Sequence, residues 1–116
     1  MSVLLVVDDE PDLGPLFEEL LKRRFEQIHF VTDVPAAEAL LGRVAVTHLV
    51  VDSVLGQRLP SGPELVARWR REHSAIGFAA VFSGDAELQG AQLPGVDEIF
   101  IKPRGFEPLL KRLLRD

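Results

Sequence analysis

The sequence contains no cysteine, which excludes disulfide bonds and metal sites built from thiolates. The absence of cysteine fits a reducing compartment, and we expect a cytoplasmic protein. The longest apolar runs, such as residues 3–7, are far too short to cross a bilayer, and no basic stretch with a following apolar core marks the N-terminus. The sequence therefore predicts neither membrane insertion nor export.

A surplus of basic residues is also missing. Lysine and arginine number 13 against 18 aspartates and glutamates, so the formal net charge is −5, which disfavours direct binding to nucleic acid. A length of 116 residues with 47% hydrophobic residues is typical of one globular core. We expect a single domain over residues 1–116.

Short apolar runs alternate with amphipathic segments along the chain, which is the pattern of β-α-β units on a parallel sheet. The first run is apolar at every position, as expected for a central strand that helices cover on both faces. The pattern therefore predicts an α/β fold, with strands at residues 3–7, 27–31, 47–51, 78–82 and 98–101.

The segments between these strands carry helix signals of unequal strength. Asp12 is expected to cap a first helix, Asp33 and Pro35 to start a second over residues 36–41, and Ser61 with Glu64 to form a capping box before a third. Residues 85–94 contain few large apolar side chains, so a fourth helix should be short or irregular. One apolar helical face is expected in each terminal helix, formed by Leu13, Leu16, Phe17, Leu20 and Leu21 in the first and by Phe106, Leu109, Leu110, Leu113 and Leu114 in the last.

Polar residues stand at the carboxyl ends of the predicted strands: Asp8 and Asp9, then Asp52, Ser83 and Lys102. Ligands of open parallel sheets bind beyond these strand ends. Three carboxylates in one place repel one another unless a hard cation neutralises them, and Mg²⁺ is the natural candidate. A lysine and a serine can contact phosphoryl oxygens, and a carboxylate can act as the nucleophile. The residues thus predict a Mg²⁺-dependent phosphoryl site.

In this combination the chain resembles the receiver domain of bacterial two-component response regulators over essentially its whole length. The resemblance implies a flavodoxin-like three-layer α/β/α fold whose doubly wound five-stranded parallel sheet has the order 2-1-3-4-5. It makes Asp52 the phosphoacceptor and a metal ligand, Asp9 a direct Mg²⁺ ligand and Asp8 a ligand acting largely through water. The backbone carbonyl of Val54 would complete the metal shell.

The same resemblance assigns two further residues to the phosphoryl group. Ser83 matches the hydroxyl residue that moves toward it, and Lys102 matches the lysine that contacts it. Lys102 precedes Pro103 in a bond that the family usually has in the cis form. From the residues alone, Ser83 could instead cap the next helix and Lys102 could be solvated.

The resemblance implies a phosphorelay role. The phosphoryl group would come from a sensor histidine kinase or a histidine phosphotransfer protein, and a downstream protein partner would respond to the changed conformation. Such a domain is not an enzyme beyond catalysing its own phosphorylation and dephosphorylation. Because the chain stops at the last predicted helix, we expect a stand-alone regulator or a piece of a larger protein. The sequence leaves open the cognate kinase, the partner, the oligomeric state and the lifetime of the phosphoryl group.

Three departures from the family pattern favour an alternative. Position 56 is glycine where the family usually has proline, and Gly62 lies ten residues after Asp52, so the loop over the site should be longer. Ile99 stands where the family has an aromatic switch residue, and the fourth helix should be shortened. The alternative is a receiver-like binding or scaffold module that works without phosphorylation.

Other polar residues are less suited to the site. Glu10 stands two residues after Asp8, where a phosphatase with an aspartate nucleophile needs a second aspartate, so we disfavour that enzyme class. We expect Glu10 to be a first-turn helix residue or an outer group of the site. His29, His48 and His73 have no metal-ligand spacing. They are expected to pack or to lie at the surface.

Overall fold

The computed structural model describes residues 1–55 and 61–115. Within these residues, five parallel strands form one sheet in the order β2-β1-β3-β4-β5, which confirms the predicted fold class and order. The glycine at position 56 lies outside the described residues. The elements are β1 (Val3–Val7), α1 (Leu13–Leu21), β2 (Gln27–Val31), α2 (Val34–Leu41), β3 (His48–Val51), α3 (Gly62–Glu72), β4 (Phe78–Ser83), the 3₁₀ helix η1 (Ala86–Leu88), β5 (Glu98–Ile101) and α4 (Phe106–Leu114).

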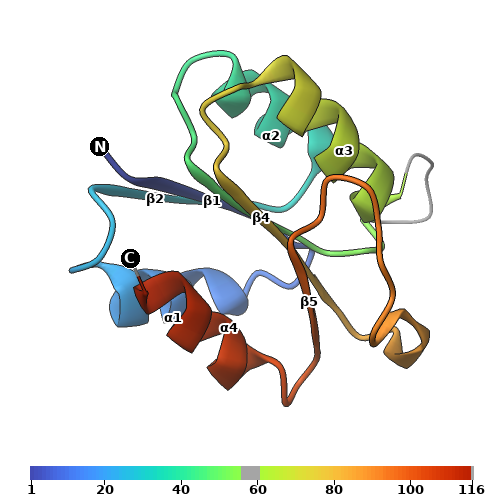
Figure 1. Ribbon diagram of the computed structural model, residues 1–116. Coiled ribbons are helices and arrows are strands. Elements are labelled where there is room, and N and C mark those ends of the chain that lie inside the picture. The colour runs from blue at the N-terminus through green and yellow to red at the C-terminus, as the bar shows by residue number, and fades with distance from the viewer. Residues whose placement is uncertain (56–60, 116) are drawn as a thin grey trace.

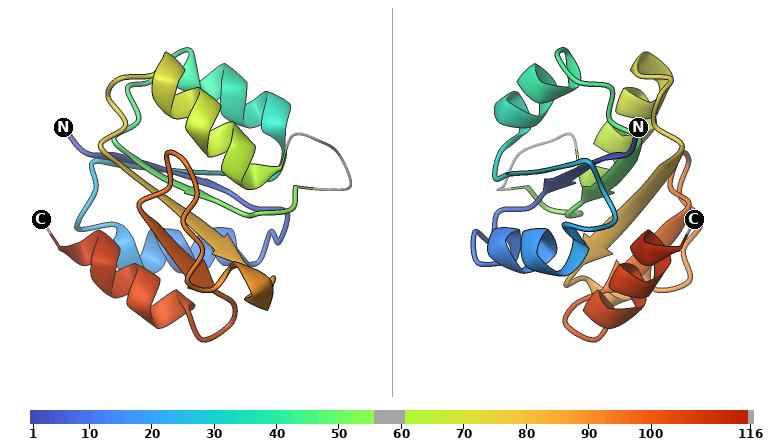
Figure 2. Two further views of the ribbon diagram at one scale, coloured as in Figure 1. Left: turned by 45° about the vertical axis from the view of Figure 1, so that its right-hand side comes forward. Right: turned by 90° about the vertical axis from the view of Figure 1, so that its left-hand side faces the viewer.

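The sheet lies between two layers of helices (Figure 1). Helices α2 and α3 cover one face, and α1 and α4 cover the other, as both views of Figure 2 show. All five residues of β1 are buried because this strand is central and covered on both sides. The three-layer arrangement predicted for the chain is therefore present.

Side chains of successive strand residues point to opposite faces of the sheet and so supply two separate cores. Trp69 of α3 is fully buried on one face, and its Nε1 donates a hydrogen bond to Glu38 of α2 at 3.1 Å. Phe17 of α1 is fully buried on the other face, where its ring makes T-shaped contacts with the rings of Phe82 and Phe106. Each such side chain contributes roughly 2–3 kcal/mol on burial. These two cores fix the sheet that carries the polar strand ends.

The first helix has a narrower buried face than its spacing predicts. Phe17 and Leu21 are fully buried between the sheet and α4, the helix that packs beside α1 on this face, whereas Leu16 and Leu20 are 47% and 50% exposed. Asp12 occupies the N-cap position without a side-chain hydrogen bond, so the cap predicted there is not formed.

The later helix starts agree better with the sequence. Asp33 Oδ1 accepts a hydrogen bond from the backbone N–H of Ala36 at 2.8 Å, and Ser61 Oγ accepts one from the N–H of Glu64 at 3.4 Å. Both side chains satisfy N–H groups that the first helical turn leaves without partners. Helix α3 consequently begins at Gly62, directly after Ser61.

The segment predicted as a short or irregular fourth helix is the 3₁₀ turn η1. Asp85 caps it by accepting the N–H of Glu87 at 3.0 Å, so Ser83 is not the cap. Gly90 follows with φ +78°, a left-handed conformation that ends any helical continuation. Along the described ranges, no helix is long and apolar enough to span a membrane.

Candidate metal and phosphate site

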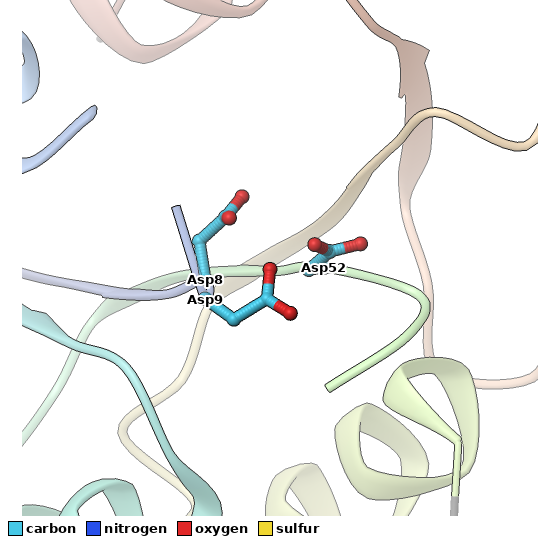
Figure 3. A group of neighbouring side chains, drawn as sticks. All are labelled: Asp8, Asp9 and Asp52. Atoms are coloured by element: carbon cyan, nitrogen blue, oxygen red, sulfur yellow. The ribbon is translucent and has the colours of Figure 1, made fainter. Parts of the chain in front are cut away.

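The register between β1 and β3 places two of the predicted carboxylates side by side at the same edge of the sheet. Val7 of β1 aligns with Val51 of β3, and the N–H of Asp52 extends this pairing by donating to the carbonyl of Val7 at 2.9 Å. Asp8 and Asp52 therefore follow the ends of adjacent strands. With Asp9 they each offer one carboxylate oxygen, and these three oxygens lie within 4.8 Å of one another. Figure 3 shows the three carboxylates gathered at the ends of β1 and β3.

Lys102, which follows β5, supplies the positive charge of this group. Its Nζ lies 2.9 Å from Asp8 Oδ2, 3.3 Å from Asp52 Oδ2 and 2.8 Å from Glu10 Oε1. Only 13% of its side chain is exposed, so the structure excludes a freely solvated lysine. The bond between Lys102 and Pro103 is cis, as expected.

Glu10 lies before helix α1 and so is not a first-turn helix residue; it is the outer group that the sequence left as the other possibility. Its backbone N–H donates to Asp8 Oδ1 at 2.9 Å, while its exposed side chain reaches Lys102. Glu10 thus contacts both Asp8 and Lys102 from the exposed side of the site. Its contact with a lysine 92 residues away gave no signal in the sequence.

The donor set fits a hard divalent cation. Asp8 is 1% exposed, and its Oδ2 has no hydrogen-bond partner, although the charge of Lys102 is 2.9 Å away. Lys102 shares its single charge among the carboxylates of Asp8, Asp52 and Glu10, so the buried Asp8 oxygen is only partly compensated and would gain from a further cation. Three oxygens from Asp8, Asp9 and Asp52 are the ligand type that Mg²⁺ and Ca²⁺ prefer. In the described ranges, no histidine joins such a group.

Burial dominates the electrostatics of the two inner acids. It raises the pKa of Asp8 above its usual value, against the lowering effects of Lys102 and the N–H of Glu10. Burial likewise raises the pKa of Asp52, against the N–H of Val54 and the charge of Lys102. For Lys102, burial lowers the pKa, but the contacts of its ammonium with the carboxylates of Glu10 and Asp8 outweigh this effect and raise the pKa overall. The raised pKa keeps Lys102 charged, and its single charge does not offset the effect of burial on Asp8 and Asp52.

The raised pKa of Asp8 predicts a pH-dependent cost without a divalent cation. As pH rises above 3.8, the unfolded chain releases this proton before the folded protein does, so the folded protein loses stability. The Asp8→Asn variant lacks this titration, so its free energy of unfolding minus that of the wild type should increase as pH rises above 3.8. Urea unfolding at several pH values in a chelating buffer measures this difference. A difference that stays constant or falls as pH rises would contradict this account.

Ser83 ends β4 and is 1% exposed, but its hydroxyl does not join the acid and lysine group. Ser83 Oγ is hydrogen-bonded to Ser53 Oγ and accepts the N–H of Asp85 at 2.9 Å. Ser53 itself was missed from the sequence. The register of β3 and β4 could have revealed it, because Val51 aligns with Val81 and two residues on Ser53 falls opposite Ser83.

Val54 and Gly62 frame the backbone of the predicted acceptor. The N–H of Val54 donates to Asp52 Oδ1 at 3.2 Å, whereas the role of the Val54 carbonyl stays a prediction. The N–H of Gly62 donates to the carbonyl of Ser53 at 3.0 Å. A Cβ on Gly62 would collide with the Asp52 carbonyl oxygen, which explains a glycine at this position despite the longer loop.

Comparison with solved structures places this geometry in a known fold. A response regulator protein from Burkholderia pseudomallei, solved with a phosphorylated aspartic acid, calcium ion and citrate, has a TM-score of 0.78 and 25% sequence identity, covering 97% of this chain and 66% of that chain. The signal receiver domain of an HD domain-containing protein from Pseudomonas fluorescens has a TM-score of 0.81 and 23% identity, covering 98% of this chain and 91% of that chain. The chain has the receiver-domain fold of response regulators. Another structure with the receiver fold, the response regulator TrrA from Thermotoga maritima in complex with Mg²⁺-BeF, has a TM-score of 0.75 and 22% identity, covering 98% of this chain and all of that chain.

These receiver-domain structures resemble the chain in fold more than in sequence. Neither protein-family models nor curated proteins match this sequence. The chain spans about two thirds of the length of the Burkholderia protein. Metal ions occur in two of the three receiver structures described above, and this chain has an aspartate cluster that could bind one.

Proposed function

We propose that residues 1–116 form one receiver domain that accepts a phosphoryl group on Asp52. The observation that carries the proposal is the group of three carboxylates at the ends of β1 and β3, contacted by the buried Lys102 from β5. A structural ion pair needs one acid for one lysine. Here Lys102 faces Asp8, Asp52 and Glu10, so the site keeps uncompensated negative charge for a cation.

In the proposed reaction, an oxygen of Asp52 attacks the phosphorus of a phosphohistidine. The new bond joins that oxygen to phosphorus, the bond between phosphorus and the histidine nitrogen breaks, and that nitrogen keeps the electron pair. Lys102 would contact one phosphoryl oxygen as a mobile point charge, and the Ser83 hydroxyl would donate to another. Positioning and charge neutralisation supply most of the catalysis in such transfers.

Asp8, Asp9 and Asp52 would hold Mg²⁺, with the Val54 carbonyl as a further ligand. When bound, the ion neutralises the charge that gathers between the carboxylates and the incoming phosphoryl group. Asp8 is proposed as a ligand because its buried carboxylate lies beside those of Asp9 and Asp52 and shares the charge of Lys102 with Asp52 and Glu10. Asp9 is exposed and lies on the solvent side of the group.

The proposed donor is a sensor histidine kinase or a histidine phosphotransfer protein, and the proposed reader is a downstream protein partner. The catalytic activity proposed is limited to the domain's own phosphorylation and dephosphorylation. The net charge of −5 supports a protein reader over direct contact with nucleic acid.

The test is incubation of the protein with an acyl phosphate donor, with Mg²⁺ or with a chelator, followed by intact mass measurement. We expect the mass of one phosphoryl group to be added with Mg²⁺ and little or none with chelator. A wild type that gains no phosphate with Mg²⁺ would overturn the proposal and favour a phosphorylation-independent binding module.

A further inference from the structure

Two buried serines meet beside the proposed acceptor. Ser53 follows β3 directly after Asp52 and is 6% exposed, and Ser83 ends β4 and is 1% exposed. Their hydroxyl oxygens are hydrogen-bonded to each other. Nothing in the function proposed above uses Ser53, although it touches the hydroxyl that is expected to contact the phosphoryl group.

The two serine partners of this bond have limited hydrogen-bonding capacity. A hydroxyl carries one proton and two lone pairs. One lone pair of Ser83 Oγ already accepts the N–H of Asp85 at 2.9 Å. In the part of the chain that the structure describes, the Ser83 hydroxyl has no hydrogen bond to Asp52 or to the Lys102 side chain, although the backbone N–H of Lys102 donates to the Ser83 carbonyl at 2.7 Å. The single Ser83 proton serves one acceptor at a time, so its donation to a phosphoryl group on Asp52 excludes its donation to Ser53.

Ser53 and the acceptor carboxylate have different surroundings. Ser53 lines a cavity of about 520 Å³ together with Pro63 and Ala67 of the α3 side. Asp52 and Lys102 do not line this cavity, and their side chains contact each other instead. A Ser83 hydroxyl that donates to a phosphoryl group on Asp52 consequently no longer donates to Ser53.

The cavity also makes this release possible. A space of about 520 Å³ has room for water beside Ser53. After Ser83 has left, water can hydrogen-bond to the Ser53 hydroxyl, so that no polar group is left unpaired. The bond between the serines therefore stabilises the resting state without trapping it.

On the basis of the function proposed above, we propose that Ser53 is a positioning residue that competes with the phosphoryl group for Ser83. Its hydroxyl holds Ser83 in the resting position, and phosphorylation of Asp52 has to replace this partner. Ser53 thereby lowers the affinity of the site for a phosphoryl group and shifts the conformational equilibrium toward the resting state.

The experiment measures beryllofluoride binding in saturating Mg²⁺ by calorimetric titration. Ser53→Ala removes the competing hydroxyl, so binding should become about fivefold tighter, which corresponds to one net hydrogen bond of about 1 kcal/mol. Ser53→Thr keeps a hydroxyl and should bind within about twofold of the wild type. In a Ser83→Ala background, Ser53→Ala should have no effect, because the hydroxyl that it competes for is gone.

Each outcome tests whether Ser53 competes with the phosphoryl group for the Ser83 hydroxyl. Unchanged or weaker binding by Ser53→Ala, beside a wild type that binds, overturns the role of Ser53 and leaves the proposed function intact. An equal gain in the Ser83→Ala background also overturns it, because the effect would then not pass through Ser83. A wild type that neither binds beryllofluoride nor accepts phosphate overturns the proposed function together with this inference.

Discussion

Replacement of Lys102 by methionine is expected to lower the free energy of unfolding by about 3 kcal/mol when no divalent cation is present. Methionine keeps the apolar stem but removes the charge that lies within 3.3 Å of Asp8, Asp52 and Glu10. Asp8 and Asp52 are buried, so they would lose their nearest compensating charge. Urea unfolding in a chelating buffer measures the loss.

Lys111→Met is the matched control, because its ion pair with Glu107 is exposed, with 74% of the lysine side chain accessible. Its expected effect is below about 0.5 kcal/mol. Addition of Mg²⁺ should stabilise Lys102→Met more than the wild type, since the cation then replaces the lost charge. Similar losses in the two variants, or an equal gain from Mg²⁺ in Lys102→Met and the wild type, would show that the acids do not form a coupled site.

The second large effect is expected for Gly62→Ala, with a loss of about 3 kcal/mol in free energy of unfolding. An added Cβ would collide with the Asp52 carbonyl oxygen and lie 2.8 Å from the Asp52 carbonyl carbon and 2.9 Å from Ser53 Cα. These are backbone atoms, so relief requires movement of the chain that carries the acceptor. We expect the same variant to bind Mg²⁺ more weakly, measured as a smaller rise in melting temperature with added Mg²⁺.

Gly84→Ala is the control for this substitution. Gly84 follows β4 directly after Ser83, and among the described residues no atom beyond its two chain neighbours lies within 4 Å of an added Cβ. Its stability should stay within about 1 kcal/mol of the wild type. If Gly62→Ala were as stable as Gly84→Ala, the close approach of α3 to the acceptor would be absent in solution.

The strands were predictable because each is a short, mainly apolar run: β1 and β4 are buried at every residue, and the edge strands β2 and β5 are partly buried. The predicted strands at residues 3–7, 27–31 and 98–101 match β1, β2 and β5, and β4 extends one residue further than predicted, to Ser83. The strand predicted from Thr47 begins one residue later, at His48. Thr47 instead binds Val3 through its side chain, accepting the N–H and donating to the carbonyl. Leu16 and Leu20 show the limit of periodicity, since the spacing marks a helical face but not how much of it a neighbour covers.

The site was predictable to the extent that strand ends coincide with charges. Asp8, Asp9, Asp52 and Lys102 meet because the carboxyl ends of parallel strands meet at one edge of the sheet. The hydroxyl partner of Ser83 depends instead on the register between two strands, and a pattern of apolar runs does not specify register. The sequence therefore indicated which residues gather at the edge, but not which of them bond to one another.

Asp52 is the proposed phosphoacceptor. The most direct test of this role compares the wild type, Asp52→Asn and the exposed control Asp12→Asn, each incubated with Mg²⁺ and an acyl phosphate and analysed by intact mass. We predict one added phosphoryl group on the wild type and on Asp12→Asn, and none on an Asp52→Asn variant that unfolds as cooperatively as the wild type. An undiminished adduct on folded Asp52→Asn would contradict the assignment.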